Sequence, residues 1–290
     1  MKIVTCRVYG GLGNQLFCYA AARALSVRNG AKLKIDNISG FINDVEYKRT
    51  YRLDNFNIPC EKTNTPYSRY KLKILKLLSR YFKIGKNRYI QQVNIDYDPN
   101  IIQLKVNNDL YIEGYWQSEK YFKDIEAIIR SDLNFVIPDE VVNLPLVSKI
   151  KLVNSVSIHV RFFDDLSSDK TNNIPKDYYI KAMKKIEKKV SEPHYFVFSN
   201  DLDAAKKMDI WKDKKVVFMF DDNFKTEDYI DMWLMSQCKH FIIANSTFSW
   251  WGAWLSKHKE KIIIAPKKEI RYGVMWWGFD GLIPESWTKI

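Results

Sequence analysis

Asn245, Ser246 and Thr247 follow a short apolar run at residues 241–244 and precede an aromatic-rich run at residues 248–255. The apolar run predicts a buried strand, and the three polar residues are of the types that cap helices. A helix that begins there directs backbone N–H groups and the positive end of its dipole at one point, where diphosphates bind. Such corners are common in α/β proteins, so the pattern alone also fits a purely structural corner.

A second corner lies near the N-terminus, where a predicted strand at residues 2–8 leads through GGLGNQ at residues 10–15 into a predicted helix. Gly11 and Gly13 allow the backbone to come close to a ligand at the start of that helix. The spacing is not that of a phosphate-binding P-loop, and a third glycine of the dinucleotide-binding pattern is missing. Asn14 either hydrogen-bonds a sugar or phosphate oxygen, or caps the helix after a tight turn.

The second half of the chain alternates predicted strands and helices, and four of its strands end in polar residues. These residues are His159 and Arg161; Ser199, Asn200 and Asp201; Asp221 and Asp222; and the cluster that begins at Asn245. In an open α/β sheet, parallel strands gather such residues at the carboxyl edge, where ligands bind. A guanidinium such as that of Arg161 binds phosphate oxygens in bidentate fashion.

Three of these strand-end residues have two interpretations each. Asn200 and Asp201 either read the edge of a guanine base or form a turn with a helix cap. His159 either contacts a nucleotide or is a strand-end histidine whose partners lie within the protein.

The chain of 290 residues carries 46 Lys and Arg against 34 Asp and Glu, a formal net charge of +12. This excess permits nucleic acid, an anionic membrane surface or a phosphorylated small molecule as partner. Residues 68–88 hold eight basic and no acidic residues at roughly helical apolar spacing. This segment predicts a basic amphipathic helix that either lies on anionic lipid or has one solvated face. Nucleic acid is disfavoured because no recognisable nucleic-acid module accompanies the charge.

No apolar run is long enough to span a bilayer, and the first residues do not form a signal peptide. The four cysteines show no C-x-x-C spacing, which indicates neither zinc nor a disulfide framework. We therefore expect buried free thiols and a cytoplasmic protein, with peripheral contact to the inner face of the cell membrane through residues 68–88.

Four segments resemble the α-1,2-fucosyltransferases of glycosyltransferase family 11, in the expected order and over nearly the whole chain. They are GGLGNQLFCYAAARAL at 10–25, SIHVR at 157–161, FVFSND at 196–201 and NSTFSWWGAWL at 245–255. One motif departs from the family pattern, because Phe162 and Phe163 stand where the family has arginine and glycine. Either Asp164 or Asp165 takes the acidic place of that motif, in a structural or acid–base role.

The resemblance implies an α/β GT-B architecture, two Rossmann-like domains facing across a cleft. Residues 1–150 would form the acceptor-side domain and residues 151–290 the GDP-fucose-binding domain, with the extreme C-terminal segment packing back on the first domain. It implies inverting, metal-independent transfer of L-fucose from GDP-β-L-fucose to the 2-hydroxyl of a terminal galactose, without a cofactor. The acceptor would be a surface glycan of the O-antigen or capsule type, free or lipid-linked. The alternatives are another nucleotide sugar on the same fold and, more remotely, a non-catalytic basic protein that binds membrane or nucleic acid.

The resemblance also implies roles for individual residues. Arg161 would neutralise the departing diphosphate, and Asn14 would hydrogen-bond the β-phosphate or the acceptor. The expected donor-binding residues are His159, Asn200, Asp201, Asn245, Ser246, Thr247, Phe248 and Ser249, together with Gly11 and Gly13. No spacing singles out a general base among the candidate acids Asp36, Glu46, Glu113 and Asp164. Core packing is the expected role of Trp250, Trp251 and Trp254.

Overall fold

The structure, a computed structural model, divides the chain into two compact units. The residues that it describes are 1–42, 44–63, 70, 73–74, 77, 88–163, 173–219, 227–267, 269–271 and 274–290. Unit 1 consists of Met1–Val136 with Asp280–Leu282, and unit 2 of Ile137–Phe279 with Ile283–Ile290. The division therefore falls before the boundary at residue 150 that the sequence suggested, and residues 280–282 belong to unit 1.

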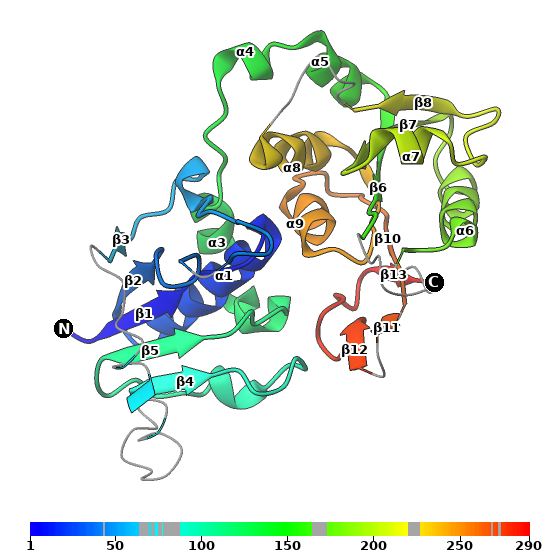
Figure 1. The fold of residues 1–290 in the computed structure, drawn as a ribbon. Helices are drawn as coiled ribbons and strands as arrows, with labels where there is room; N and C mark the ends of the chain where they lie inside the picture. The colour runs from blue at the N-terminus through cyan, green and yellow to red at the C-terminus, as the bar shows by residue number, and fades with distance from the viewer. Residues whose placement is uncertain are drawn as a thin grey trace. The chain divides into compact units, whose positions relative to one another are not determined.

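Unit 1 is built on a five-stranded parallel sheet with the strand order β3-β2-β1-β5-β4 (Figure 1). The strands are β1 (Ile3–Arg7), β2 (Lys32–Asp36), β3 (Glu61–Lys62), β4 (Tyr89–Gln91) and β5 (Leu110–Glu113). The helices are α1 (Leu12–Arg28) and α3 (Glu126–Asp132), with the 3-10 turns η1 (Leu53–Asn55), η2 (Pro99–Ile101), η3 (Glu119–Tyr121) and η4 (Lys123–Ile125). The order places the carboxyl ends of β1 and β5 side by side at the middle of the sheet.

Helix α1 is the central helix of unit 1, because it is buried along most of its length and packs against β1 and β2 (Figure 1). Its alanines and large apolar residues fit this place, since alanine favours helix and lets the helix approach the sheet closely. Leu16, Phe17 and Tyr19 are fully buried. The helix follows β1 directly through Gly10, whose positive φ of 77° is readily adopted only by glycine.

Unit 2 repeats the α/β plan with a six-stranded sheet of order β13-β10-β9-β6-β7-β8, again parallel throughout. Its strands are β6 (Asn154–Val160), β7 (Pro193–Ser199), β8 (Lys215–Phe218), β9 (His240–Ile242), β10 (Ile263–Ala265) and β13 (Thr288–Lys289). Its helices are α4 (Asp139–Val142), α5 (Pro145–Leu152), α6 (Lys176–Glu187), α7 (Leu202–Lys206), α8 (Asp228–Gln237) and α9 (Thr247–Leu255). A separate antiparallel hairpin joins β11 (Glu269–Arg271) to β12 (Val274–Trp277).

The aromatic helix α9 forms part of the core of unit 2 and packs against α8. Trp250 and Trp251 are fully buried, and Trp254 is 4% exposed. The ring of Trp250 lies 5.3 Å from that of Trp287 near the chain end, centroid to centroid. The expected core role of these tryptophans is confirmed. All four cysteines are free, and Cys6, Cys18 and Cys238 are buried, as expected.

Two sequence predictions fall largely or wholly outside the described residues: the basic helix at 68–88 and the acidic pair at 221–222. None of the helices in the described part of the chain is both long and apolar enough to cross a membrane.

Candidate active site

The predicted donor corner of unit 2 lies where β6 and β9 run side by side. The two strands pair in parallel from Val156 opposite His240 to Ile158 opposite Ile242. This register carries the end of β6 alongside the segment that leads into α9. The ring of His159, in β6, and that of Phe248, in the first turn of α9, lie 5.7 Å apart. The sheet thus brings two motifs together that are almost ninety residues apart in the sequence.

His159 is a buried, neutral histidine at this corner. Its side chain is 5% exposed, and its Nδ1 atom has no hydrogen-bond partner among the described residues. Burial, and next the positive charge of Arg161, lower the pKa of His159 from 6.5 to about 3. A neutral imidazole can donate one hydrogen bond and accept another, and the positive charge at the corner therefore belongs to Arg161 alone of these two residues.

Helix α9 begins at this corner with a side-chain cap. The Ser246 hydroxyl accepts a hydrogen bond from the backbone N–H of Phe248 at 3.3 Å. The hydroxyl of Ser249 donates to the Ser246 carbonyl at 3.2 Å and is fully buried, and Asn245 is 2% exposed. These two hydroxyls thus stabilise the helix start itself. What the nine-residue helix contributes to the corner is the positive end of its dipole, with Thr247 as its first residue.

The loop after β6 is held by the end of β7. The side chain of Asn200 accepts a hydrogen bond from the N–H of Phe162 and donates one to its carbonyl, both at 2.9 Å. The N–H of Phe163 donates to Asn173 at 2.8 Å. Phe162 packs against the core of unit 2, while the guanidinium of Arg161 lies over the Phe163 ring at 5.3 Å. The two phenylalanines that depart from the family pattern therefore anchor the loop and support Arg161.

Asp201 caps α7. Its carboxylate accepts from the N–H of Ala204 at 2.9 Å, and its N–H and carbonyl both bond to the Ser199 hydroxyl. For Asn200 and Asp201 the structure thus shows the turn and helix cap that the sequence offered as one alternative. Asp164 and Asp165 lie outside the described residues.

At the glycine corner of unit 1, helix α1 begins at a different residue from the one that capping by Asn14 would imply. Gly11 is the N-cap of α1, without a side-chain cap, and Asn14 is the third residue of the helix. The alternative in which Asn14 caps the helix is therefore wrong. The guanidinium of Arg49 lies beside Gly11, where a Cβ would meet it at 3.7 Å, an ordinary van der Waals contact. Gly13 is buried within the first turn of α1.

Gln15 ties the loop around Thr50 to this corner. Its amide nitrogen donates to the carbonyls of Gly10 and Thr50, and its oxygen accepts from the N–H of Arg52, each at 2.9 Å. The backbone of the loop at Thr50 and Arg52 is thereby attached to the start of α1. Sequence reasoning missed this loop because no spacing links it to the glycine motif.

The Asn14 side chain lies between two residues that follow β5. Its oxygen accepts from Gln117 at 2.8 Å, and its amide bonds to the Tyr115 hydroxyl. The ring of Tyr115 in turn stacks on that of Tyr9 at 4.4 Å, so residues after both β1 and β5 meet at Asn14. The sequence contained no signal for Tyr115 or Gln117 beyond their place directly after a predicted strand.

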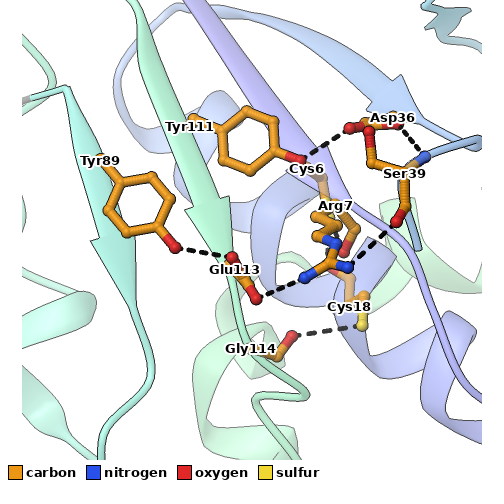
Figure 2. Close-up of polar contacts among 9 residues, drawn as sticks. All are labelled: Cys6, Arg7, Cys18, Asp36, Ser39, Tyr89, Tyr111, Glu113 and Gly114. Carbon is orange, nitrogen blue, oxygen red and sulfur yellow. Dashed lines mark hydrogen bonds and ion pairs between the residues drawn. The ribbon is translucent and has the colours of Figure 1, made fainter. Parts of the chain in front are cut away.

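Two of the candidate bases are bound into a polar network at the carboxyl ends of the strands (Figure 2). Asp36 is fully buried and accepts from the Tyr111 hydroxyl and from the N–H groups of residues 38 and 39. Glu113 pairs with Arg7 at 2.5 Å and accepts from the Tyr89 hydroxyl at 2.6 Å. Asp36 is therefore inaccessible to a substrate hydroxyl, and the charge of Glu113 is neutralised by its own arginine.

Within the described part of the chain, no three His, Cys, Asp or Glu side chains gather closely enough to hold a metal ion. The groups that do gather at the two corners are an arginine, a neutral histidine, amides and helix N-termini, which are groups that bind anions and sugar hydroxyls.

The two parallel α/β sheets, with polar residues at their strand ends, give the chain a GT-B architecture. Among solved structures, a mutant of Arabidopsis thaliana FUT1 in complex with GDP has a TM-score of 0.51 at 14% identity, covering 94% of this chain and 71% of that one. NodZ α-1,6-fucosyltransferase soaked with GDP-fucose has a TM-score of 0.48 at 13% identity, covering 88% and 92%.

The chain belongs to glycosyltransferase family 11, whose model matches residues 3–271. An α-1,2-colitosyltransferase of Escherichia coli is 31% identical over 319 aligned positions, which cover 100% of this chain and 99% of that protein. The O-antigen biosynthesis glycosyltransferase WbnK of E. coli is 28% identical, covering 89% and 92%. The family resemblance of the four motifs is thus confirmed, and the protein is a glycosyltransferase, which leaves the non-catalytic alternative without support.

Proposed function

We propose that the protein is an inverting transferase that moves L-fucose from GDP-β-L-fucose to the 2-hydroxyl of a terminal galactose in a bacterial surface glycan. The observation that carries the proposal is the unit 2 corner, where Arg161, a neutral His159 and the start of α9 meet. Unit 2 is the donor-binding unit in this proposal, and unit 1 is the acceptor-side unit.

Departure of GDP is the step that this corner assists. As the sugar–phosphate bond breaks, negative charge grows on the diphosphate, and fixed donors must stabilise it when no metal does so. Arg161 offers a permanent positive charge and two parallel N–H donors, and its stacking on Phe163 limits the side-chain motion that binding must suppress. The dipole of α9 adds a positive potential that acts on the same anion. A neutral His159 orients the donor by hydrogen bonding, without a charge that would vary near neutral pH.

Inversion follows from attack on the face opposite the leaving GDP, which converts the β-linked donor into an α-linked product. The transition state has oxocarbenium character, as in glycoside hydrolysis. We assign no general base, since Asp36 and Glu113 are bound into the structure of unit 1. A weak base suffices if departure of GDP runs ahead of attack.

Asn14 is proposed to act on the acceptor side, as a hydrogen-bond donor to an oxygen of the acceptor or of the β-phosphate. Its amide is part of an ordered cluster with Gln117 and Tyr115, which suits a side chain that must be oriented before substrate binds. We propose that Asn200 and Asp201 support this site by holding a loop and capping a helix, rather than by binding the donor themselves.

A second candidate donor is GDP-colitose, which the E. coli colitosyltransferase at 31% identity favours. Colitose is L-fucose without the 3-hydroxyl group. A site that hydrogen-bonds this hydroxyl would reject colitose by a factor of about 10⁴, whereas an apolar pocket would reject fucose only weakly, by about 10². The ratio of kcat/KM for the two donors therefore reports which sugar the pocket is built for.

Contact with the cell membrane is proposed through the basic segment 68–88, with a cytoplasmic location and a glycan acceptor that is free or lipid-linked. Replacing its lysines and arginines by glutamine should weaken sedimentation with anionic liposomes and spare transfer to a soluble acceptor. Equal sedimentation of the variant would remove the membrane contact from the proposal.

The experiment that tests the proposal is GDP release from GDP-fucose with a panel of β-galactosides in EDTA, beside GDP-colitose, GDP-mannose and UDP-galactose. Release that requires both GDP-fucose and a galactoside, with an α-1,2 product by NMR, is the expected result. Turnover with only one of the other nucleotide sugars would mean that this compound, and not GDP-fucose, is the donor. Loss of activity in EDTA that added metal restores would overturn metal independence.

A further inference from the structure

The loop that follows β5 is locked to α1 on one side and to the end of β4 on the other. On the α1 side, Asn14 and Cys18 stand four residues apart and so lie on one face of the helix. Asn14 accepts from Gln117 at 2.8 Å. The Cys18 thiol donates to the Gly114 carbonyl at 3.2 Å, as Figure 2 shows. Both ends of the segment 114–117 are therefore attached to the same helix face.

On the other side, Gln92 fixes the backbone of the loop. Its side-chain oxygen accepts from the N–H groups of Tyr115 and Trp116 at 2.9 and 3.0 Å. Trp116 is 2% exposed and has a positive φ of 53°, a conformation that non-glycine residues adopt only when their surroundings enforce it. The position of Gln117 is thus set by its neighbours before any substrate binds.

The bond from Gln117 determines which way the Asn14 amide points. The Gln117 Nε2 atom is a donor, so it holds the oxygen end of the Asn14 amide. The nitrogen end is directed at the other side, where it lies 3.1 Å from the Cβ position that a side chain at Gly10 would occupy. The Tyr115 hydroxyl lies 3.0 Å from the same point. The donor end of Asn14 therefore faces the turn between β1 and α1.

We propose that Gln117 is a positioning residue, which acts on the reaction by holding the Asn14 amide with its nitrogen toward the Gly10–Tyr115 corner. This inference rests on the proposed role of Asn14 and adds to it a residue from a different strand end. A reversed amide would present an oxygen where the substrate requires a donor, and the interaction would change from attractive to repulsive. An error of this kind in a catalytic contact costs about 10- to 100-fold in rate.

The test compares two substitutions of the same residue that differ in hydrogen-bond polarity. Gln117→Glu has nearly the same shape but can only accept, so the Asn14 amide must turn its nitrogen toward it. Gln117→Lys can only donate and preserves the native orientation. We expect Q117E to lower kcat by about 10- to 100-fold with the KM for the GDP-sugar changed by less than about 2-fold, and Q117K to remain within about 5-fold of wild type. The exposed Gln103 provides the matched control, Q103E, with unchanged activity.

A double-mutant cycle separates positioning from the added negative charge of Q117E. If Gln117 acts through Asn14, then N14A and N14A/Q117E have the same kcat, because the group that is positioned is already absent. A further 10-fold loss in the double variant would mean that the charge acts by itself, and would overturn the inference. Equal kcat of Q117E and wild type would also overturn it.

The orientation itself has a readout that needs no turnover. The side-chain amide signals of Asn14, identified by their absence in N14A, should shift in Q117E and stay close to their wild-type positions in Q117K. Unchanged signals in Q117E would overturn the inference even if the rate fell. If wild-type protein releases GDP from no GDP-sugar, the proposed function fails, while the amide signals still decide the role of Gln117.

Discussion

The side chain of Asn200 and the backbone of Phe162 are joined by two hydrogen bonds in opposite directions, both 2.9 Å long. Beyond the end of β6, the side-chain amide of Asn200 thereby takes the place of a neighbouring strand as hydrogen-bonding partner of the Phe162 backbone. This pair fixes the path of the chain directly after Arg161, the residue proposed to stabilise the leaving diphosphate. The motif at residues 196–201 therefore also holds the loop that directly follows the motif at residues 157–161.

Replacing Asn200 should reduce turnover through this loop without altering base recognition. We expect N200A to lower kcat by about 10-fold, since the guanidinium of Arg161 is no longer held in place. The measurement is kcat together with inhibition by GDP, ADP and UDP. A loss of the preference for GDP would show that Asn200 reads guanine after all.

Asp201→Ala serves as the comparison. It removes the cap of α7, which costs about 1 kcal/mol of unfolding free energy, and should leave kcat within about 2-fold of wild type.

Arg161→Ala should lower kcat by about 10²- to 10³-fold, because one fixed donor to a developing anion contributes about that much. Arg161→Lys keeps the charge but loses the bidentate geometry, and we expect an intermediate loss. Steady-state transfer under saturating donor measures both. The matched variant Phe163→Leu keeps the arginine and removes only the aromatic ring beneath it, with an expected loss below about 10-fold. An R161A enzyme within a few-fold of wild type would contradict the mechanism.

His159 predicts a pH dependence of stability. Its pKa is about 3 in the folded protein, well below the ordinary value of 6.5, because burial and then Arg161 disfavour the charged form. Below pH 6.5 the unfolded chain therefore binds a proton that the folded chain does not, so stability falls as pH decreases, by at most about 1.4 kcal/mol per pH unit for this group. Urea unfolding at pH 7.0 and 5.5 should show this loss in wild type and a smaller one in H159Q.

The control for this measurement is His194, which is only partly buried at the start of β7. H194Q should change the difference between the two pH values less than H159Q does. An H159Q variant with the same pH dependence as wild type would mean that His159 is protonated in the folded state.

Lys261 stabilises the far end of α9. Its ammonium group donates to the carbonyls of Ala253, Trp254 and Ser256 at 3.1, 3.2 and 2.7 Å. These are the acceptors that a helix C-terminus leaves without intrahelical partners, and a cation there also favours the helix dipole. We expect K261M to lower the unfolding free energy by about 1 to 3 kcal/mol, measured in urea. K259M, at an exposed position two residues earlier, should have little effect, and an equal loss in both variants would contradict the capping role.

The amino-acid sequence by itself determined the class of fold and the family. Apolar runs that end in polar residues predicted β1 of unit 1 and β6, β7, β8 and β9 of unit 2, because buried parallel strands carry continuous apolar residues and their ends meet at one edge. The short strands β3, β4 and β13 were not predicted. The segments 10–25 and 245–255 are long enough and specific enough in composition to indicate the family without tertiary information. The core role of the α9 tryptophans also followed from local sequence, since a helix that is apolar all round must be buried.

Tertiary structure decided which partners the polar side chains have within the protein. Asn200, Asp201, Ser246 and Ser249 have suitable types and places for donor binding, yet their side chains hold a loop or a helix start. A sequence pattern reports that a polar group lies at a strand end, but not which partner it finds. That partner depends on strand order and register, which bring together residues far apart in the chain.

The partners of Asn14 also could not be predicted from the sequence. Gln117 stands 103 positions later, and only the adjacency of β1 and β5 in the sheet brings it within 2.8 Å. The charge state of His159 likewise depends on burial by its fold neighbours rather than on its motif. Hydrogen-bond direction and burial are properties of packed neighbours, and for this reason the sequence identified the two corners while the fold determined what each side chain does there.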